Sequence, residues 1–340
     1  IDWYNKVSRD LLMEQLTPLE LGSSTGAMMN NVGKVKNTGV EISLSTVNVQ
    51  TKDFYWSTTF SFAKNKNEIL ELNGGKEDLV ANKWFIGQPI DVIYDYEYAG
   101  VCTAEEARAY ATNDAIKTKF IEGEMKLKDQ QQPGEEGYGV IDENDLVVLG
   151  HALPKWTGSV TSNMTYKNFD FSFSIYTKQG GMVESPFMAE FTNYKDRGRN
   201  KLKMDYYIPA GTPVLNADGS GYTLTTEAHM GAYPYPTNTA NNNYGGGIGW
   251  GTDKQTTYVG NSYVDNSFVK IKNITLGYTF PKSWMSKIGV DHLRLYVNVL
   301  NPFTFTSYKG FDPEWADAAL NDGTGGPSSR TYQVGVNLKF

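Results

Sequence analysis

The strongest constraint on the fold of this chain is a regular alternation of apolar and polar residues over long segments. In the last ten residues, 331–340, every second side chain is aromatic or aliphatic, and the positions between are polar or glycine. Residues 54–63 and 169–178 repeat the pattern, with phenylalanine at most apolar positions. Because successive side chains in a β-strand point to opposite faces, the pattern predicts strands with one apolar and one polar face.

These predicted strands are longer than those of most soluble proteins. Strands of soluble domains usually have about 5–6 residues, whereas a tilted strand that crosses a membrane needs about 9–11. Aromatic residues recur at strand ends, as at Trp156, Tyr166 and Phe280, which is typical of the aromatic girdles of outer-membrane barrels. The segments that fit a membrane-spanning strand are 1–14, 34–48, 54–67, 156–167, 169–180, 267–280, 292–304 and 331–340.

Composition narrows the possible functions. Aromatic residues make up 13% of the chain, yet its mean hydropathy is −0.44, and no stretch approaches the ~18 consecutive apolar residues of a membrane helix. The chain could therefore cross a membrane only as a closed β-barrel. A net charge of −7 argues against a nucleic-acid partner, because phosphates require a basic surface. The single cysteine, Cys102, excludes an internal disulfide and a cysteine-rich metal site.

The connections between the predicted strands alternate strictly between short and long. Outer-membrane barrels have short periplasmic turns and long extracellular loops, so such a barrel requires this alternation. We therefore predict an all-β fold, an antiparallel transmembrane β-barrel segment of about eight strands with long extracellular loops. The predicted short turns are 49–53, 168–169 and 281–291, and the predicted long loops are 15–33, 68–155, 181–266 and 305–330.

Part of the 68–155 loop has predicted structure of its own. Residues 87–101 also have strand character, but a further crossing there would break the alternation, so we assign them to the extracellular loop. Thr103 and Glu106 have the spacing of a capping box and predict a helix that follows directly. Ordered loops of this length are usually functional.

The sequence contains no recognisable catalytic arrangement. His151, His229 and His292 lie far apart, without a neighbouring nucleophile or a zinc-type spacing. Acidic residues are plentiful, but nothing singles out a pair of carboxylates for glycoside hydrolysis. We predict that the chain is not an enzyme and that it needs no cofactor.

An acidic turn at 138–150 is a weak candidate for calcium binding. Gly139, Ile141 and Asp145 match the second half of an EF-hand-type loop, in which glycine turns the chain and an acid completes the ligand set. The acids of the first half are missing. The candidate calcium ligands are Asp142 and Asp145, and the alternative that we favour is a solvated acidic turn.

Four stretches, in order along the chain, resemble the motifs of one family. Residues 31–45 resemble an Asn-x-Gly…Asn-x-Gly-x-Glu strand, and 268–281 resemble a Phe-x-Arg-Leu-Lys-Asn-Ile-x-Leu-Gly-Tyr-x-Phe-Pro strand, with Lys270 where arginine is usual. Residues 293–314 resemble a strand and loop that end in Gly-x-Asp-Pro-Glu, and 335–340 resemble the last strand. Together they resemble the SusC/RagA-type TonB-dependent outer-membrane transporters of the Bacteroidota type.

The resemblance implies a 22-stranded barrel with an N-terminal plug. On that basis residues 1–340 are the C-terminal part of the barrel, and the plug domain and the earlier strands are absent. It also implies an integral protein of the bacterial outer membrane that imports a nutrient, foremost an oligosaccharide and otherwise a peptide. The implied partners are a SusD-like surface lipoprotein, TonB–ExbB–ExbD acting through the missing N-terminal part, and the barrel-assembly machinery.

Two other functions remain open from the sequence. The strands could close into a small barrel of their own that acts as an enzyme or adhesin, although the two longest loops are large for so small a rim. The chain could also be a soluble β-rich carbohydrate-binding domain, which would need no detergent. Pairing of segment 1–14 with segment 331–340 would favour the small barrel, and open edges there would favour part of a larger one.

The alternation also predicts which side chains face lipid and which face the lumen. A charge at the bilayer midplane costs about 2–4 kcal/mol, so Glu41 and Arg294 are the most informative positions. The predicted lipid-facing residues are Val40, Ile42, Leu44, Phe60, Phe171, Phe173, Leu293, Leu295, Val297, Val334 and Val336. The predicted lumen-facing residues are Glu41, Ser43, Ser159, Asn163, Ser172, Arg294, Asn298, Gln333 and Asn337.

Substrate contacts are expected at the loop-lined mouth of the barrel. Aromatic rings stack on flat sugar faces, and polar groups satisfy sugar hydroxyls that would otherwise stay unpaired. The alternative is that the same aromatic residues pack the loop against the barrel rim. The candidates for substrate binding are Trp84, Tyr94, Asp95, Tyr96 and Tyr98.

Phe340 is the candidate assembly signal. It continues the apolar series of the last strand, and the resemblance implies that an aromatic residue closes that strand. We expect Phe340 to be the true C-terminus and its ring to lie at the periplasmic interface, where aromatic girdles occur.

Overall fold

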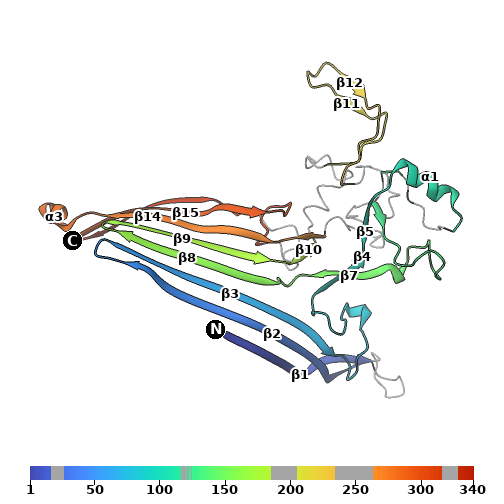
Figure 1. Cartoon of the computed structure of the whole chain (residues 1–340), viewed down its shortest axis with the longest axis horizontal. Helices are drawn as coiled ribbons and strands as arrows, with labels where there is room; N and C mark the ends of the chain where they lie inside the picture. The colour runs from blue at the N-terminus through green and yellow to red at the C-terminus, as the bar shows by residue number, and fades with distance from the viewer. Residues whose placement is uncertain are drawn as a thin grey trace.

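A sheet of eight long antiparallel strands dominates the structure (Figure 1). The computed structural model describes residues 1–16, 27–115, 120, 122–123, 125–184, 205–233, 263–315 and 328–340. Within these residues the strand order is β1-β2-β3-β8-β9-β14-β15-β16, so each long strand pairs with the long strands before and after it. The long strands are β1 (Asp2–Leu16), β2 (Ala27–Gln50), β3 (Phe54–Glu71), β8 (Trp156–Tyr166), β9 (Phe169–Gln179), β14 (Phe268–Thr279), β15 (His292–Thr306) and β16 (Thr331–Lys339).

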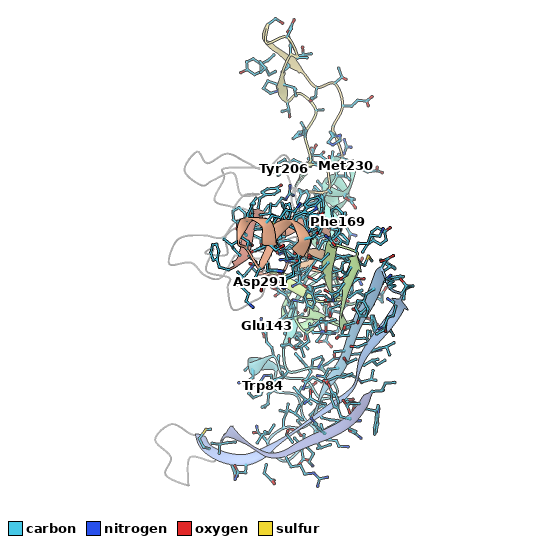
Figure 2. The ribbon with its side chains drawn as sticks, turned by 90° about the vertical axis from the view of Figure 1, so that its left-hand side faces the viewer. Trp84, Glu143, Phe169, Tyr206, Met230 and Asp291 are labelled. Atoms are coloured by element: carbon cyan, nitrogen blue, oxygen red, sulfur yellow. The ribbon has the colours of Figure 1, made fainter. Side chains whose placement is uncertain are left out.

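The eight predicted strands are confirmed, and their connections alternate between the two ends of the sheet as predicted. Three short connections, 51–53, 167–168 and 280–291, lie at one end of the sheet, which we call the turn end. The third contains α3 (Lys282–Met285) and η5 (Ser286–Ile288). The long connections leave the opposite end, the loop end (Figure 1). Figure 2 looks along the strands from the turn end and shows that the sheet is a curved wall.

The first long loop was predicted wrongly. It was expected to span 15–33, but β1 and β2 pair as far as Leu16↔Ala27, so the connection is only 17–26. Register shifts between Ser8 and Leu12 interrupt the ladder, and Asp10 has a positive φ of 56°. Such irregularities change which residues share a face, which explains why the alternation in the sequence ends before the strands do.

The two faces of the sheet differ in polarity as predicted. Val297 pairs with Leu276 of β14 and with Val334 of β16, which places an apolar band on one face. On the other face, Asn298 accepts a hydrogen bond from Asn273 at 2.7 Å and donates one to Gln333 at 2.9 Å. The register places Arg294 and Glu41 on this polar face. We call the two sides the apolar face and the polar face.

Glycine allows an ion pair to cross one strand of the polar face. Arg294 of β15 donates to Asp170 of β9 from Nε at 2.8 Å and from Nη2 at 2.5 Å. The residue between them, on β14, is Gly277, and a Cβ there would meet both the carboxylate and the guanidinium. Gly335 lies beneath the ring of Tyr296 in the same way. Aromatic rings over glycine help to fix the register of strands.

The sheet is open in the part of the chain that the structure describes. β1 and β16 lie at opposite edges and do not pair with each other. Side chains on both edge strands are exposed, with Trp3 at 71% and Val334 at 80%. A self-contained barrel closed by these two strands is therefore not formed, which agrees with the prediction of a segment of a larger barrel.

The strands end at different heights at the loop end. β3 pairs with β8 only as far as Ala63↔Thr157, whereas β2 and β3 continue to pair as far as Lys34↔Glu71. β1 and β2 continue further still, to Leu16↔Ala27. The wall made by β1 to β3 therefore projects beyond β8 and β9.

The loop end carries a layer of short elements, which we call the loop layer (Figure 1). Residues 87–101 belong to it, as predicted, because β4 and β5 pair with β7 and β6 and not with the large sheet. The predicted helix is α1, and Thr103 and Glu106 form its capping box. Cys102, Phe120 and Leu127 form a small buried cluster. The elements are η2 (Val80–Asn82), β4 (Val92–Tyr96), β5 (Tyr98–Val101), α1 (Ala104–Thr112), β6 (Met125–Leu127), η3 (Glu143–Asp145), β7 (Leu146–His151), β10 (Met182–Glu184), β11 (Pro213–Leu215), β12 (Tyr222–Leu224) and β13 (Tyr263–Asp265).

None of the helices in the described ranges has the length and apolarity that a membrane crossing would need.

Candidate functional site

The first two residues predicted to bind substrate pack within the loop layer. Trp84, labelled in Figure 2, contacts a buried pair formed by Ile69 and Leu72 near the loop end of β3. The ring of Tyr94 lies 4.7 Å from the ring of Phe85, measured between centroids. Both candidates are half-buried, so each already has a packing role.

The remaining three candidates connect separate parts of the loop layer. Tyr96 and Tyr98 pack against the Cys102 cluster. The Tyr98 hydroxyl donates to the Ala232 carbonyl at 3.0 Å, and burial, with a smaller effect of Tyr233, raises the pKa of Tyr98 to about 12. Asp95 accepts a hydrogen bond from the Tyr263 hydroxyl at 2.5 Å. These contacts support the packing alternative, and substrate binding by the five residues stays a prediction.

The acidic turn is built by hydrogen bonds to its carboxylates. Asp145 is fully buried and accepts from the backbone N–H groups of Gln130 at 2.7 Å and Asp142 at 2.8 Å. Asp142 accepts from the N–H of Asn144 at 2.8 Å. The expectation of a solvated turn is therefore wrong for Asp145, because the backbone donors replace water around its carboxylate.

The same arrangement does not fit a calcium ion between the two predicted ligands. Asp142 and Asp145 both serve as acceptors for backbone donors of the turn. Across the described ranges, no three His, Cys, Asp or Glu side chains are grouped so as to hold a metal. Calcium binding by Asp142 and Asp145 stays a prediction that the arrangement of these groups does not support.

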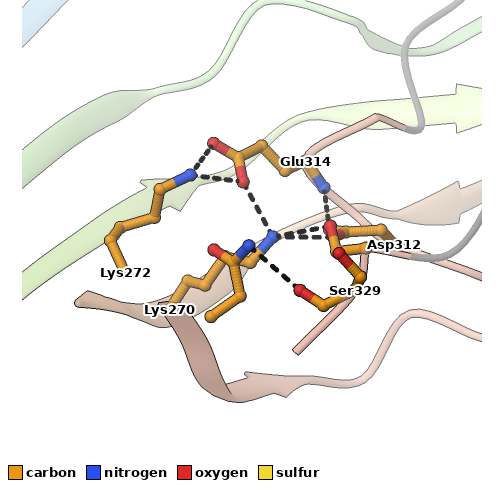
Figure 3. Close-up of polar contacts among 7 residues, drawn as sticks. Lys270, Lys272, Asp312, Glu314 and Ser329 are labelled. Carbon is orange, nitrogen blue, oxygen red and sulfur yellow. Dashed lines mark hydrogen bonds and ion pairs between the residues drawn. The ribbon is translucent and has the colours of Figure 1, made fainter. Parts of the chain in front are cut away.

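A buried ion cluster ties the loop after β15 to the wall of the sheet (Figure 3). The ammonium of Lys270 on β14 is 2.6 Å from Asp312 and 2.8 Å from Glu314, and the Lys270 side chain is only 1% exposed. Lys272 binds both oxygens of Glu314, at 2.7 and 2.8 Å. Ser328 donates to Asp312. We call these five residues the Lys270 cluster.

The charges of the Lys270 cluster balance. Two lysines face two carboxylates, as buried charges require. Burial alone would raise the pKa of Glu314, but hydrogen bonds from Lys270 and Lys272 outweigh it and lower that pKa. Because Asp312 and Glu314 follow β15 in the chain and both lysines lie on β14, the cluster fixes the start of this loop over the polar face near the loop end.

A pocket of about 350 Å³ lies beside the Lys270 cluster. One wall comes from the loop end of β15 and the other from the loop that the cluster holds in place. Arg330, directly before β16, also lines the pocket, and its guanidinium lies 5.8 Å from the centroid of the Phe303 ring. The lining residues are Asn301, Thr304, Thr306, Tyr308, Gly310, Phe311, Asp312, Pro313, Ser328 and Arg330.

The sequence pointed to this region without revealing its chemistry. The Gly-x-Asp-Pro-Glu motif and the substitution at Lys270 were noticed as parts of a resemblance. Nothing in strand alternation shows that Lys270 and Asp312, separated by 42 positions, would pair. Arg330 carried no signal, since it lies in neither a motif nor a predicted strand.

Comparisons with known proteins agree on the kind of protein that the chain resembles. No protein-family profile matches it. TonB-dependent receptor P3 of Formosa agariphila is 29% identical over all of this chain, which covers 32% of that receptor. TonB-dependent receptor SusC of Bacteroides thetaiotaomicron is 28% identical, again over all of this chain and 30% of the receptor. The chain thus spans about a third of the length of the curated relatives it matches.

Solved structures show the same fold. The structure of the RagAB peptide transporter aligns with 99% of this chain, with a TM-score of 0.63 and 21% identity. The aligned part is 33% of the transporter chain. The same importer in its open-open state gives a TM-score of 0.63 at 22% identity. These neighbours are transporter barrels, which confirms the predicted all-β barrel-segment fold.

The relatives also bear on location and activity. They are receptors and transporters, which are not enzymes, in agreement with the prediction of no enzymatic activity. They confirm the predicted location in the bacterial outer membrane. The resemblance to the SusC/RagA-type TonB-dependent transporters is confirmed over the whole chain, which corresponds to one part of such a transporter.

Proposed function

We propose that this chain forms one side of the wall and mouth of a TonB-dependent outer-membrane nutrient importer. The observation that carries the proposal is a two-faced sheet whose connections lie alternately at its two ends, with the longest ones all at the loop end. The apolar face would contact lipid, and the polar face would line the lumen. The similarity to receptors named TonB-dependent supports the same function.

Partners follow from the same similarity. A SusD- or RagB-like surface lipoprotein would cover the mouth on the side of the loop layer, and TonB would supply energy through a part of the protein outside this chain. The SusC and RagAB relatives support both. Assembly by the barrel machinery through Phe340 is a further part of the proposal.

The substrate that we propose first is an oligosaccharide, and a peptide is the alternative. The half-buried Tyr94 and Tyr96 are still candidates to contact it, although both also pack within the loop layer. Replacing both with alanine in the full transporter and measuring binding by calorimetry separates the two roles. Unchanged affinity with an intact loop layer would remove them from the substrate site.

The importer function is tested by uptake into cells that carry the full-length protein and its lipoprotein partner. Labelled oligosaccharides and peptides are supplied, with and without TonB. We expect accumulation of one substrate class that depends on TonB and stops when the proton gradient is dissipated. Uptake that proceeds equally without TonB would indicate a passive pore and would contradict the proposal.

A further inference from the structure

The apolar face changes character toward the loop end of β2 and β3. Ile42 of β2 pairs with Phe62 of β3 on this face. The next two positions of β3 on the same side of the sheet are Lys64 and Lys66, and Lys36 follows on the same side of β2. We call Lys36, Lys64 and Lys66 the lysine row. The side of the sheet that is apolar lower down thus becomes cationic where β2 and β3 project beyond their neighbours.

The height of the lysine row follows from strand geometry. Phe54 marks the turn end of the apolar face, where its ring lies 6.4 Å from that of Tyr166. From Phe54 to Lys64, β3 covers about 34 Å at about 3.4 Å per residue. In a barrel strand tilted by about 40° this distance corresponds to a height of about 26 Å, and the apolar band of an outer-membrane barrel is about 25 Å tall. Lys64 therefore lies where the apolar band ends.

Aromatic rings mark the same boundary. The rings of Phe62 and Trp156 lie 5.7 Å apart on the apolar face, and Ala63, the residue after Phe62, pairs with Thr157, the residue after Trp156. Aromatic residues are typical of the interface between lipid and water on such barrels. The lysine row follows directly beyond this pair of rings.

The lysine row has more positive charge than its neighbours can balance. Lys64 is exposed, and the side chain of Lys66 is 66% exposed. Within the described part of the chain, no carboxylate lies at ion-pair distance from Lys36 or Lys64. Lys66 is 3.5 Å from Glu68, and such a pair with a well-exposed lysine is weak. The row is therefore able to bind an anion.

The three lysines are close enough to act together. Lys64 and Lys66 are two positions apart on one strand, which separates their Cα atoms by about 7 Å. Because Lys66 pairs with Thr38, Lys36 is its diagonal neighbour on β2, at about 7–8 Å. The long, flexible lysine side chains can converge on one phosphate or on two neighbouring phosphates, which lysine binds as a point charge.

We propose that the lysine row binds the phosphate groups of lipids in the outer leaflet of the outer membrane. The proposal rests on the proposed function, which assigns the apolar face to lipid and the loop end to the cell exterior. Cationic side chains beside an anionic lipid surface are attracted to it. Continuity of the row with the apolar band favours a lipid, whose acyl chains would cover that band while its headgroup meets the lysines.

The test uses the full-length transporter in complex with its lipoprotein partner, freed of bound lipid. Bisphosphorylated lipid A and a dephosphorylated lipid A with the same acyl chains are titrated, and bound lipid is measured by native mass spectrometry. The variants are Lys66→Gln, the double variant Lys64→Gln/Lys66→Gln, and its conservative form with arginine at both positions. Folding is checked by heat-dependent mobility on gels.

The matched control is Lys6→Gln. Lys6 is an exposed cation on β1 that pairs with Asn37, the neighbour of Lys36. Because successive residues of a strand point to opposite faces, Lys6 lies at a similar height to the lysine row but on the polar face. The control removes the same charge from the other side of the sheet.

We expect the wild type to bind bisphosphorylated lipid A in preference to the dephosphorylated form. The affinity should fall about fivefold in Lys66→Gln and about tenfold or more in the double variant, because each lysine near an anionic lipid surface contributes about a factor of five. Arginine at both positions should preserve binding, and Lys6→Gln should bind like the wild type.

Three results would overturn the proposal. These are unchanged affinity in the double variant, equal binding of the two lipids by the wild type, and an equal loss in Lys6→Gln and Lys66→Gln. The same spectra report the lipoprotein and the number of transporter copies. Loss of either partner from the double variant, with lipid binding unchanged, would assign the lysine row to a protein contact and also contradict the proposal.

TonB-dependent uptake by the wild type is measured in parallel. Normal uptake together with any of these contrary results removes the lipid site alone, whereas absence of TonB-dependent uptake removes the proposed function.

Discussion

The sheet and the loop layer of this chain are stabilised in different ways. In the sheet, backbone hydrogen-bond ladders run over 9 to 24 residues per strand. The side chains there mainly determine which face is apolar and which is polar. In the loop layer the strands have 3 to 6 residues, too few for independent stability. Position there depends on individual polar contacts, such as those of Lys270, Asp145 and Tyr98. The sheet should therefore tolerate the loss of single contacts better than the loop layer does.

The largest expected effect is at the junction between the two regions. Lys270→Ala would leave Asp312, only 3% exposed, without its cation, and breaking a buried pair in this way costs about 3–5 kcal/mol. Lys272→Ala is the matched control, because its side chain is 37% exposed and such pairs contribute about 1 kcal/mol or less. Hydrogen exchange of residues 307–315 in the full transporter measures how far each substitution destabilises the loop. Similar protection in the two variants would contradict the special role of Lys270.

The next largest effect should separate the two faces of the sheet. Val297→Arg places a charge on the apolar face and should cost about 2–4 kcal/mol if that face meets lipid at mid-depth. Asn298→Arg changes the neighbouring residue on the polar face, where the lumen can hydrate the charge. Thermal unfolding in detergent and in lipid compares the variants. Equal losses would contradict the assignment of faces.

Deleting Phe340 tests assembly against stability. Its side chain is 84% exposed, and loss of its contact with the membrane interface should cost on the order of 2 kcal/mol. We expect a larger fall in the amount that reaches the cell surface, and Phe340→Trp should restore it. Surface labelling and heat stability are measured on the same samples. Normal surface levels after the deletion would rule out the assembly signal.

The smallest expected effect is local to the loop layer. Thr103→Ala removes the N-cap of α1 and should cost about 1 kcal/mol, whereas Thr112→Ala at the other end loses only bonds to Arg108 and Ala109 carbonyls. Hydrogen exchange of the backbone amides in α1 measures the stability of the helix in each variant. If exchange rises equally in the two variants, the cap has no special role.

The same cap should weaken only in acidic solution. Burial would raise the pKa of Glu106, but its bonds to Lys126 and to the backbone of Thr103 lower that pKa below 4.5. A carboxylate whose pKa is lowered in the folded state stabilises the fold at every pH above its pKa in the unfolded state. This stabilisation is lost as the pH falls through the pKa of the folded state. Protection of α1 should therefore persist at pH 5 and decline below about 4.5.

The sequence predicted the sheet well because the alternation of a strand depends only on residues that are neighbours in the chain. Val334, Val336 and Leu338 reveal their common face without any knowledge of the neighbouring strand. The start of β2 at Ala27 was missed because the register shifts opposite Gly33 and Asn31, where the alternation in β2 breaks down. The capping box at Thr103 and Glu106 was predictable for the same reason as the strands, since its two members are three residues apart.

The contacts that shape the loop layer and the pocket could not be predicted in this way. Lys270 meets Asp312, and Tyr98 meets Ala232, across 42 and 134 positions. Such pairs depend on how the long connections return over the sheet, which no local pattern encodes. Aromatic residues on a loop look alike in the sequence whether they bind a ligand or fill a core, and Tyr96 and Tyr98 illustrate this ambiguity.

The uneven height of the strands gives the mouth two unlike sides. β2 has 24 residues and β8 has 11, so at about 3.4 Å per residue β2 is longer by about 40 Å. The tall side consists of the paired strands β1 to β3, and the long chains between β3 and β8 and between β9 and β14 lead into the shorter strands β8 and β14. In the proposed importer, a partner that covers this rim would contact the wall made by β1 to β3 before it reaches β8 and β9.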